Sequence, residues 1–132
     1  MANSNGVFTL RNSIIAYPAN GTNSHYAGKT FTFQGRNISS DRSFKLSGVP
    51  RAQVTQLLTN LDPRLDTLAR NGGTVETIRL LDDSPAIRFA LTNYGLGFDA
   101  RGVARPSGTN ADLGAYQYGV GLVAPTIVQQ PV

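Results

Sequence analysis

Apolar residues occur in short runs with turn residues between them. Segments 7–17 (VFTLRNSIIAY), 30–34 (TFTFQ), 74–81 (TVETIRLL) and 112–119 (DLGAYQYG) each combine β-branched or aromatic residues with alternating polar positions. Such runs are typical of strands. Pro, Asn-Gly and Gly-Gly turn signals separate them. The pattern therefore predicts an all-β fold.

One segment has helical spacing. Between Pro50 and Leu61, the apolar residues Leu57, Leu58 and Leu61 follow Val54 after three, four and seven residues. This spacing places them on one face of a helix, and proline suits a first helical turn. We expect one short helix near 50–61.

The connections between the strands are long and uneven, and 93–111 is a Gly-rich loop. Antiparallel hairpins would show more two-residue turns. Long connections favour a solenoid, here a right-handed parallel β-helix of few coils with a C-terminal loop-rich cap. Stacked coils align their inward side chains in columns, for which the candidates are Phe8, Leu10, Ile14, Phe31, Phe33, Ile38 and Ile78. Asn12 and Asn37 are either rungs of an asparagine ladder between coils or ordinary turn residues.

Composition narrows the function classes. The 132 residues include 40% hydrophobic and 15% charged residues, and the net charge is +4. The arginines are scattered singly, so we expect no nucleic-acid partner, although an acidic polysaccharide stays open. There is no cysteine, which excludes disulfides and thiolate metal sites. No apolar run reaches the roughly 18 residues of a membrane span.

The residues that could carry chemistry are isolated. His25 is the only histidine, and Asp82-Asp83 are more simply turn residues than a calcium site. No strand presents two carboxylates at i and i+2, the arrangement that paired acid/base chemistry would favour. We expect no enzyme, metal or cofactor. Five tyrosines suggest core and rim packing more than a sugar platform: Tyr17, Tyr26, Tyr94, Tyr116 and Tyr118.

Four charged residues near the C-terminus are candidates for bracing a loop. Asp99 and Arg101 are two residues apart and could pair with each other, or contact Arg105 and Asp112. Ion pairs and charged hydrogen bonds can hold a Gly-Pro loop that has no regular structure. We expect these groups to be structural, with no catalytic role.

Six segments follow one another in a fixed order along the chain: LRNSIIA (10–16), GRNISSD (35–41), TNLDPRLDTLARNGG (59–73), SPAI (84–87), DARGVARP (99–106) and DLGAYQY (112–118). In this order they resemble the C-terminal region of bacterial right-handed β-helix surface proteins of the choice-of-anchor or polymorphic outer-membrane-protein type. Arg88, Ala90 and Gln117 depart from that pattern, which puts in doubt any contact that the family makes there.

The resemblance implies a structural module at the bacterial cell surface or outside the cell. The alternative is a carbohydrate-binding or accessory portion of a β-helix enzyme that acts on polysaccharides. We expect residues 1–119 to form terminal coils and a cap. Upstream coils of a longer parent chain, or another subunit, would cover the end formed by the first strand.

Residues 120–132 form an apolar tail containing two prolines. We expect this tail to cap its own solenoid or to add as a strand to a neighbour, which would allow head-to-tail self-association into a fibre. The residues expected to make that contact are Val120, Leu122, Val123, Ile127 and Val128.

Overall fold

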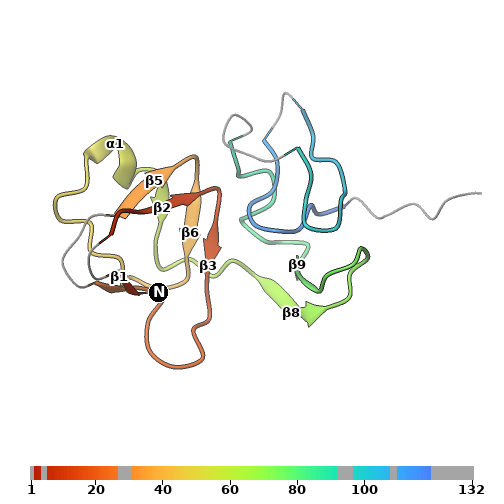
Figure 1. The fold of residues 1–132 in the computed structure, drawn as a ribbon, viewed down its shortest axis with the longest axis horizontal. Helices are drawn as coiled ribbons and strands as arrows, with labels where there is room; N and C mark the ends of the chain where they lie inside the picture. The colour runs from red at the N-terminus through yellow and green to blue at the C-terminus, as the bar shows by residue number, and fades with distance from the viewer. Residues whose placement is uncertain (1, 4–5, 27–30, 92–96, 108–109, 120–132) are drawn as a thin grey trace, which may run out of the picture.

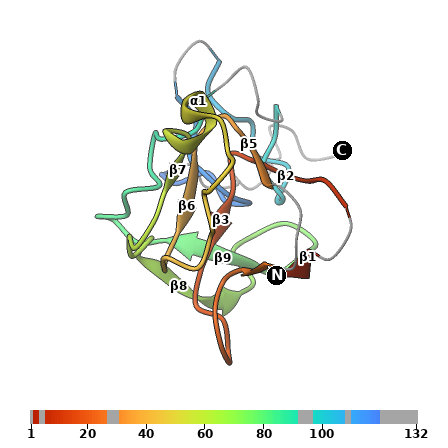
Figure 2. The ribbon, with the colours of Figure 1, turned by 90° about the vertical axis from the view of Figure 1, so that its left-hand side faces the viewer.

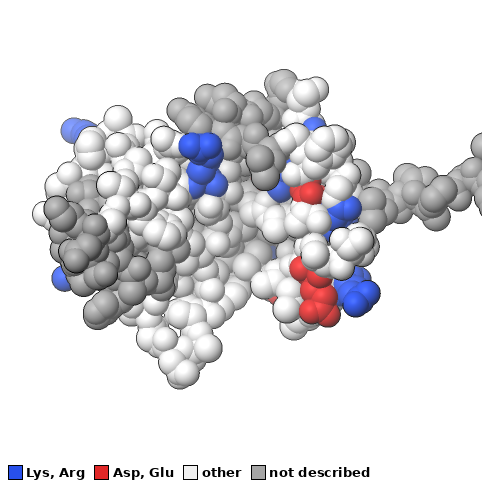
Figure 3. Space-filling model, viewed as in Figure 1, with Lys and Arg blue, Asp and Glu red and all other residues white. Residues whose placement is uncertain are grey.

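The computed structural model describes residues 2–3, 6–26, 31–91, 97–107 and 110–119. These residues form nine short strands and one helix of four residues, so the fold is predominantly β, as the sequence predicts. The first seven strands and the helix lie on one side of the molecule in Figure 1, and the last two strands lie on the other side, below an irregular lobe that the chain forms from about residue 81 onward. On the face drawn in Figure 3, the Asp and Glu side chains lie on the side of this lobe.

The first half of the chain returns to pair with itself in parallel. Strand β1 (Ala2–Asn3) pairs with β4 (His25–Tyr26), and β2 (Phe8–Arg11) pairs with β5 (Phe31–Gln34). Strands β3 (Ile14–Ile15), β6 (Asn37–Ser39) and β7 (Leu57–Leu58) form a three-stranded parallel sheet in that order. Figure 2 shows these three strands side by side.

Parallel pairing aligns apolar residues in register. Phe8 lies opposite Phe31, and Leu10 lies opposite Phe33. Phe31 and Phe33 are each only 1% exposed, and both pack edge-to-face against Phe44. This packing forms a first core cluster from side chains of successive passes of the chain: Leu10, Phe31, Phe33, Phe44 and Leu57.

The helix is shorter than the sequence pattern predicts. Helix α1 spans Arg51–Val54, and Leu57–Leu58 is strand β7. The extended backbone lets Asn37 donate its N–H to the carbonyl of Gln56 at 2.7 Å, and it buries Leu57 in the first cluster. Pairing with β6 and this burial outweigh the helical spacing of the leucines.

The second half begins with an antiparallel hairpin of β8 (Leu65–Ala69) and β9 (Thr77–Leu80). The expectation that Ile78 points into a core column is wrong. Ile78 lies opposite Leu68 on an exposed face and is 42% exposed. Its neighbours Thr77 and Leu80 are the buried residues of this strand, because they face the irregular lobe and the second core.

The strand expected at 112–119 is absent. Among the described residues of this lobe, regular pairing is limited to the single bridges Ala90–Ala111 and Phe98–Ala104. Small side chains allow close backbone packing here, and most of the second core cluster is aliphatic: Ile38, Leu80, Ala86, Ala90, Ala111 and Leu113. Polar side chains accept many of the backbone N–H groups here, which strand pairing would otherwise satisfy.

The two asparagines expected as ladder rungs both bridge distant parts of the chain. Asn37 is fully buried; it accepts the N–H of Ser13 at 3.0 Å and donates to the carbonyl of Gln56 at 3.2 Å. It therefore links the passes before and after its own. Asn12 accepts the N–H of Arg36 at 3.1 Å and donates to the carbonyl of Leu91 at 2.7 Å, which ties the strands to the irregular lobe.

Candidate functional site

The irregular lobe is organised around the carboxylate of Asp99. One oxygen accepts the N–H groups of Arg101 and Val103 at 2.8 and 3.0 Å. The other accepts the N–H of Gln117 and the Nε of Arg101, both at 2.9 Å. A carboxylate that accepts several N–H groups closes a loop without any strand or helix.

Arg101 completes an almost fully buried ion pair. Its side chain is 1% exposed and that of Asp99 is 0% exposed, with 2.8 Å between Nη2 and Oδ2. The guanidinium also donates to the carbonyls of Gln117 and Asn71, at 2.8 and 3.2 Å, and lies 3.8 Å from the centre of the Tyr116 ring. The planar guanidinium thus links three separated segments, and a lysine could not make all of these contacts.

Asp112 closes the second half of the lobe. Its carboxylate accepts the N–H of Arg88 at 2.7 Å and the N–H of Tyr118. Arg88 has a left-handed backbone, with φ of 54°, which is uncommon for a side chain of this size. The hydrogen bond to Asp112 helps to hold that conformation.

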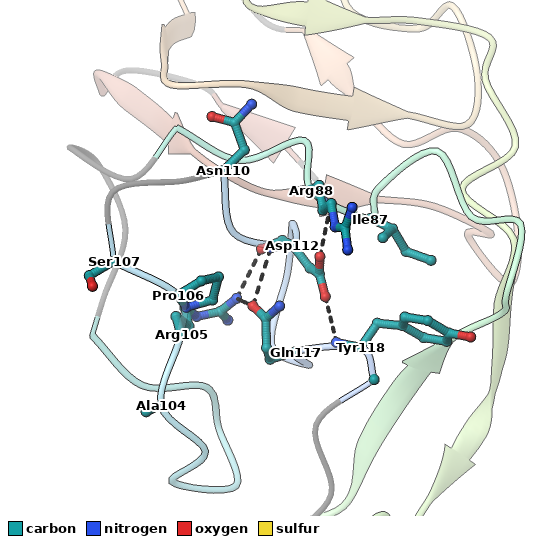
Figure 4. A pocket seen from close by; sticks show the side chains of 11 residues that line it. Ile87, Arg88, Ala104, Arg105, Pro106, Ser107, Asn110, Asp112, Gln117 and Tyr118 are labelled. Atoms are coloured by element: carbon teal, nitrogen blue, oxygen red, sulfur yellow. Dashed lines mark hydrogen bonds between the residues drawn. The ribbon is translucent and has the colours of Figure 1, made fainter.

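Arg105 braces the lobe through neutral acceptors. It donates to the carbonyl of Asp112 at 2.9 Å, to the carbonyl of Gly114 at 2.5 Å, and to the side-chain oxygen of Gln117 at 3.4 Å. The predicted contact between Arg105 and Asp112 therefore exists, but through the Asp112 backbone. Figure 4 shows the bonds of Arg105 to Asp112 and Gln117.

Burial and hydrogen bonding compete at these groups. Burial acts to raise the pKa of Asp99, but hydrogen bonds from the Gln117 N–H and the Arg101 side chain outweigh it, so the net pKa is lowered. Burial lowers the pKa of Arg105, although the nearby Asp99 and Asp112 charges oppose this. Arginine starts from so high a pKa that Arg105 stays charged at neutral pH.

A pocket of about 1040 Å³ lies beside this network (Figure 4). Its wall includes Arg88, Arg105, Asp112 and Gln117, with Tyr118 at one side. The pocket thus combines two guanidinium groups with one carboxylate.

Comparisons with models of protein families, with curated proteins and with solved structures give no match to this chain.

The other candidates from the sequence do not converge on this site. Within the described ranges, no group of three or more His, Cys, Asp or Glu side chains could hold a metal ion. Asp83 pairs with Arg64 at 2.6 Å on the surface. The backbone of His25 lies in β4, but its side chain, and the whole of Tyr94, are outside the described residues.

The tail residues Val120, Leu122, Val123, Ile127 and Val128 also lie outside the described residues. In the part of the chain that the structure describes, no helix is long and apolar enough to cross a membrane.

The sequence reasoning missed Gln117 and Asn71. Gln117 is 5% exposed and contacts Asp99, Arg101, Arg105 and Asp112 through its backbone and side chain. The sequence marks Gln117 only as a departure from the pattern of the family that the chain resembles, and no local signal indicates its central position. Asn71, which precedes the Gly72-Gly73 turn, offers its carbonyl to Arg101 from the hairpin.

The arrangement favours a structural role for both carboxylates, which hold backbone segments in place. Every carboxylate oxygen of Asp99 and Asp112 accepts at least one hydrogen bond from a backbone N–H. These hydrogen bonds hold both carboxylates in fixed positions, and for Asp99 they lower the pKa, which makes that carboxylate poorly suited to exchange protons with a substrate near neutral pH.

Proposed function

We propose that this chain is a non-enzymatic structural module: the terminal coils and cap of a right-handed parallel β-helix in a bacterial extracellular or cell-surface protein. Its role is to stack on further coils, either of a longer parent chain or of another copy.

The observation that carries the proposal is the parallel sheet β3–β6–β7 with Asn37 at its centre. The buried Asn37 side chain binds Ser13 on one side and Gln56 on the other. Stacked coils need such rungs, because a buried backbone group without a partner is costly. An asparagine side chain that bonds the passes of the chain on both sides suits a module that extends by stacking.

The irregular lobe supports a capping role. It packs Ala86, Ala90 and Leu113 against Ile38 of the strands, and the Asp99–Arg101 pair holds it together internally. A cap covers the apolar core at one end of a solenoid. The motif order LRNSIIA to DLGAYQY also supports this assignment.

The unpaired edges of the first strands suit assembly. Strand β2 pairs only with β5 and strand β3 only with β6 among the described residues, so each has an edge turned away from its partner. Such edges can accept another strand. The apolar tail 120–132 of a neighbouring copy supplies a suitable segment, and repetition of that contact would build a fibre.

The test is light scattering and electron microscopy on the full chain, on a chain without residues 120–132, and on Leu122→Ser/Ile127→Ser. The proposal predicts concentration-dependent assemblies of the full chain that both changes abolish. The control Thr126→Ser/Gln129→Ser alters the tail without removing apolar side chains and should assemble normally. A monodisperse monomer for every protein would contradict self-assembly.

A further inference from the structure

The pocket in Figure 4 has an unneutralised positive charge at its wall. Arg88 is exposed at the pocket, and no described residue forms an ion pair with its guanidinium. Its strained φ of 54° places a long cationic side chain at this position, where glycine would be the easy choice.

The single carboxylate in the pocket does not cancel this charge. Both oxygens of Asp112 are held by backbone N–H groups, of Arg88 and Tyr118. Arg105 is likewise without an ion pair among the described residues. Its guanidinium donates to the carbonyls of Asp112 and Gly114 and to the side chain of Gln117. The pocket therefore has two positive charges for one negative charge, and Arg88 has donors to offer.

The remaining wall mixes apolar and polar side chains. Ile87 and Pro106 offer apolar surface, whereas Asn110 and Ser107 can hydrogen-bond to hydroxyl groups. Tyr118 is partly buried at the side opposite Arg105. A sugar ring has the matching chemistry, with apolar C–H faces and hydroxyl groups at its edge. The volume is at the upper end of the roughly 300–1,000 Å³ typical of ligand pockets, which suits more than one ring.

We propose that this pocket binds a uronic-acid unit of an acidic polysaccharide, with the sugar carboxylate on the guanidinium of Arg88. An arginine fork matches a carboxylate with two parallel hydrogen bonds. A peptide that ends in a free carboxylate is the rival ligand. The residues that line the pocket belong to no strand, so the peptide backbone could not pair with a strand edge there. This binding site is independent of the assembly proposed above.

The experiment is calorimetric titration of the full chain with trigalacturonate and with triglucuronate, each compared with its methyl ester. The proposal predicts that at least one acid binds and that its ester binds about tenfold more weakly or not at all. It also predicts that Arg88→Gln weakens acid binding about tenfold. The matched control is Arg42→Gln, which removes the same charge from an exposed arginine in the strand half and should leave binding within about twofold.

Three outcomes would overturn the proposal. One is equal binding of acid and ester, and the second is an equal effect of Arg88→Gln and Arg42→Gln, which would indicate unspecific charge attraction. The third is no saccharide binding at millimolar concentration while a short peptide with a free C-terminus binds in an Arg88-dependent manner. Circular dichroism of Arg88→Gln shows whether the variant folds; if it does not, Arg88→Lys, which keeps the charge but loses the fork, replaces it and should also weaken acid binding.

Discussion

Gly73 lies against the backbone of Arg101, so closely that a Cβ added to Gly73 would be 2.8 Å from the Arg101 Cα. Gly73 has a φ of 80°, which glycine adopts without strain. The turn of the β8–β9 hairpin is thus fitted to the segment that carries the buried ion pair. This contact, with the bond from Arg101 to the Asn71 carbonyl, joins the hairpin to the irregular lobe.

Replacing Gly73 with alanine should therefore cost more than conformational strain alone. We expect Gly73→Ala to lower the free energy of unfolding by about 3 kcal/mol, because the new methyl group displaces the Arg101 backbone. The control is Gly48→Ala, at a φ of 81° with nothing within 4 Å, which should cost only about 1 kcal/mol. Urea denaturation measures both, and equal costs would show that the close approach is unimportant.

Removing the charge of Asp99 should destabilise the irregular lobe strongly. Asp99→Asn leaves the guanidinium of Arg101 buried without its partner, so we expect a loss of about 3 kcal/mol in unfolding free energy. Asp66→Asn breaks the exposed pair between Asp66 and Arg79 and should change stability little. Thermal unfolding compares the two variants; a similar small shift for both would argue against the Asp99–Arg101 pair as the brace.

The asparagine rung gives a third expectation. Asn37→Ala leaves the Ser13 N–H without its acceptor in a fully buried position, so we expect a loss of about 2 kcal/mol in unfolding free energy. The exposed Asn20 provides the control, and Asn20→Ala should be nearly neutral. Chemical denaturation measures the unfolding free energy of both variants, and a neutral Asn37→Ala would mean that this side chain does not hold β3, β6 and β7 together.

The sequence predicted the strand half of the fold well because its signals are local. Phe31 and Phe33 alternate with polar residues, and they point inward as alternation requires. The registers Phe8–Phe31 and Leu10–Phe33 follow once the strands pair in parallel. For Asn37 the sequence left a ladder rung and an ordinary turn residue equally open, and the structure shows a side chain that bonds the passes on both sides.

Prediction failed where tertiary contacts decide the local structure. Leu57 and Leu58 have helical spacing, but pairing with β6 makes them a strand. Ile78 looked like a core residue until the hairpin placed Thr77 and Leu80 inward instead. At 112–119, the contacts of Asp112 and Gln117 with residues before position 106 replace a strand, and no local pattern encodes them.

Acid should destabilise the protein only below about pH 4. Burial acts to raise the pKa values of Asp41 and Asp99, but hydrogen bonds outweigh it and lower both in the folded state. The stability that these groups contribute is therefore complete above the unfolded value of about 3.9 and is lost as the pH falls through the lower folded pKa. Urea denaturation at pH 7, 5 and 3 should show little change between the first two and a loss at the third. Asp99→Asn should show a smaller loss at pH 3, and a steep loss already between pH 7 and 5 would contradict this assignment.

The parallel register of β2 and β5 is the feature on which the proposal of stacked coils rests. The chain has no cysteine, so a pair can be introduced without interference. Thr9 and Thr32 are direct partners across the two strands. Adjacent strands lie about 4.8 Å apart, within disulfide range, whereas a shift of two residues moves the partners beyond about 7 Å. The decisive measurement is the extent of disulfide formation under mild oxidation: Thr9→Cys/Thr32→Cys should cross-link readily and Thr9→Cys/Gln34→Cys poorly. Preferential cross-linking of the second pair, or none in the first, would contradict the stacked parallel arrangement.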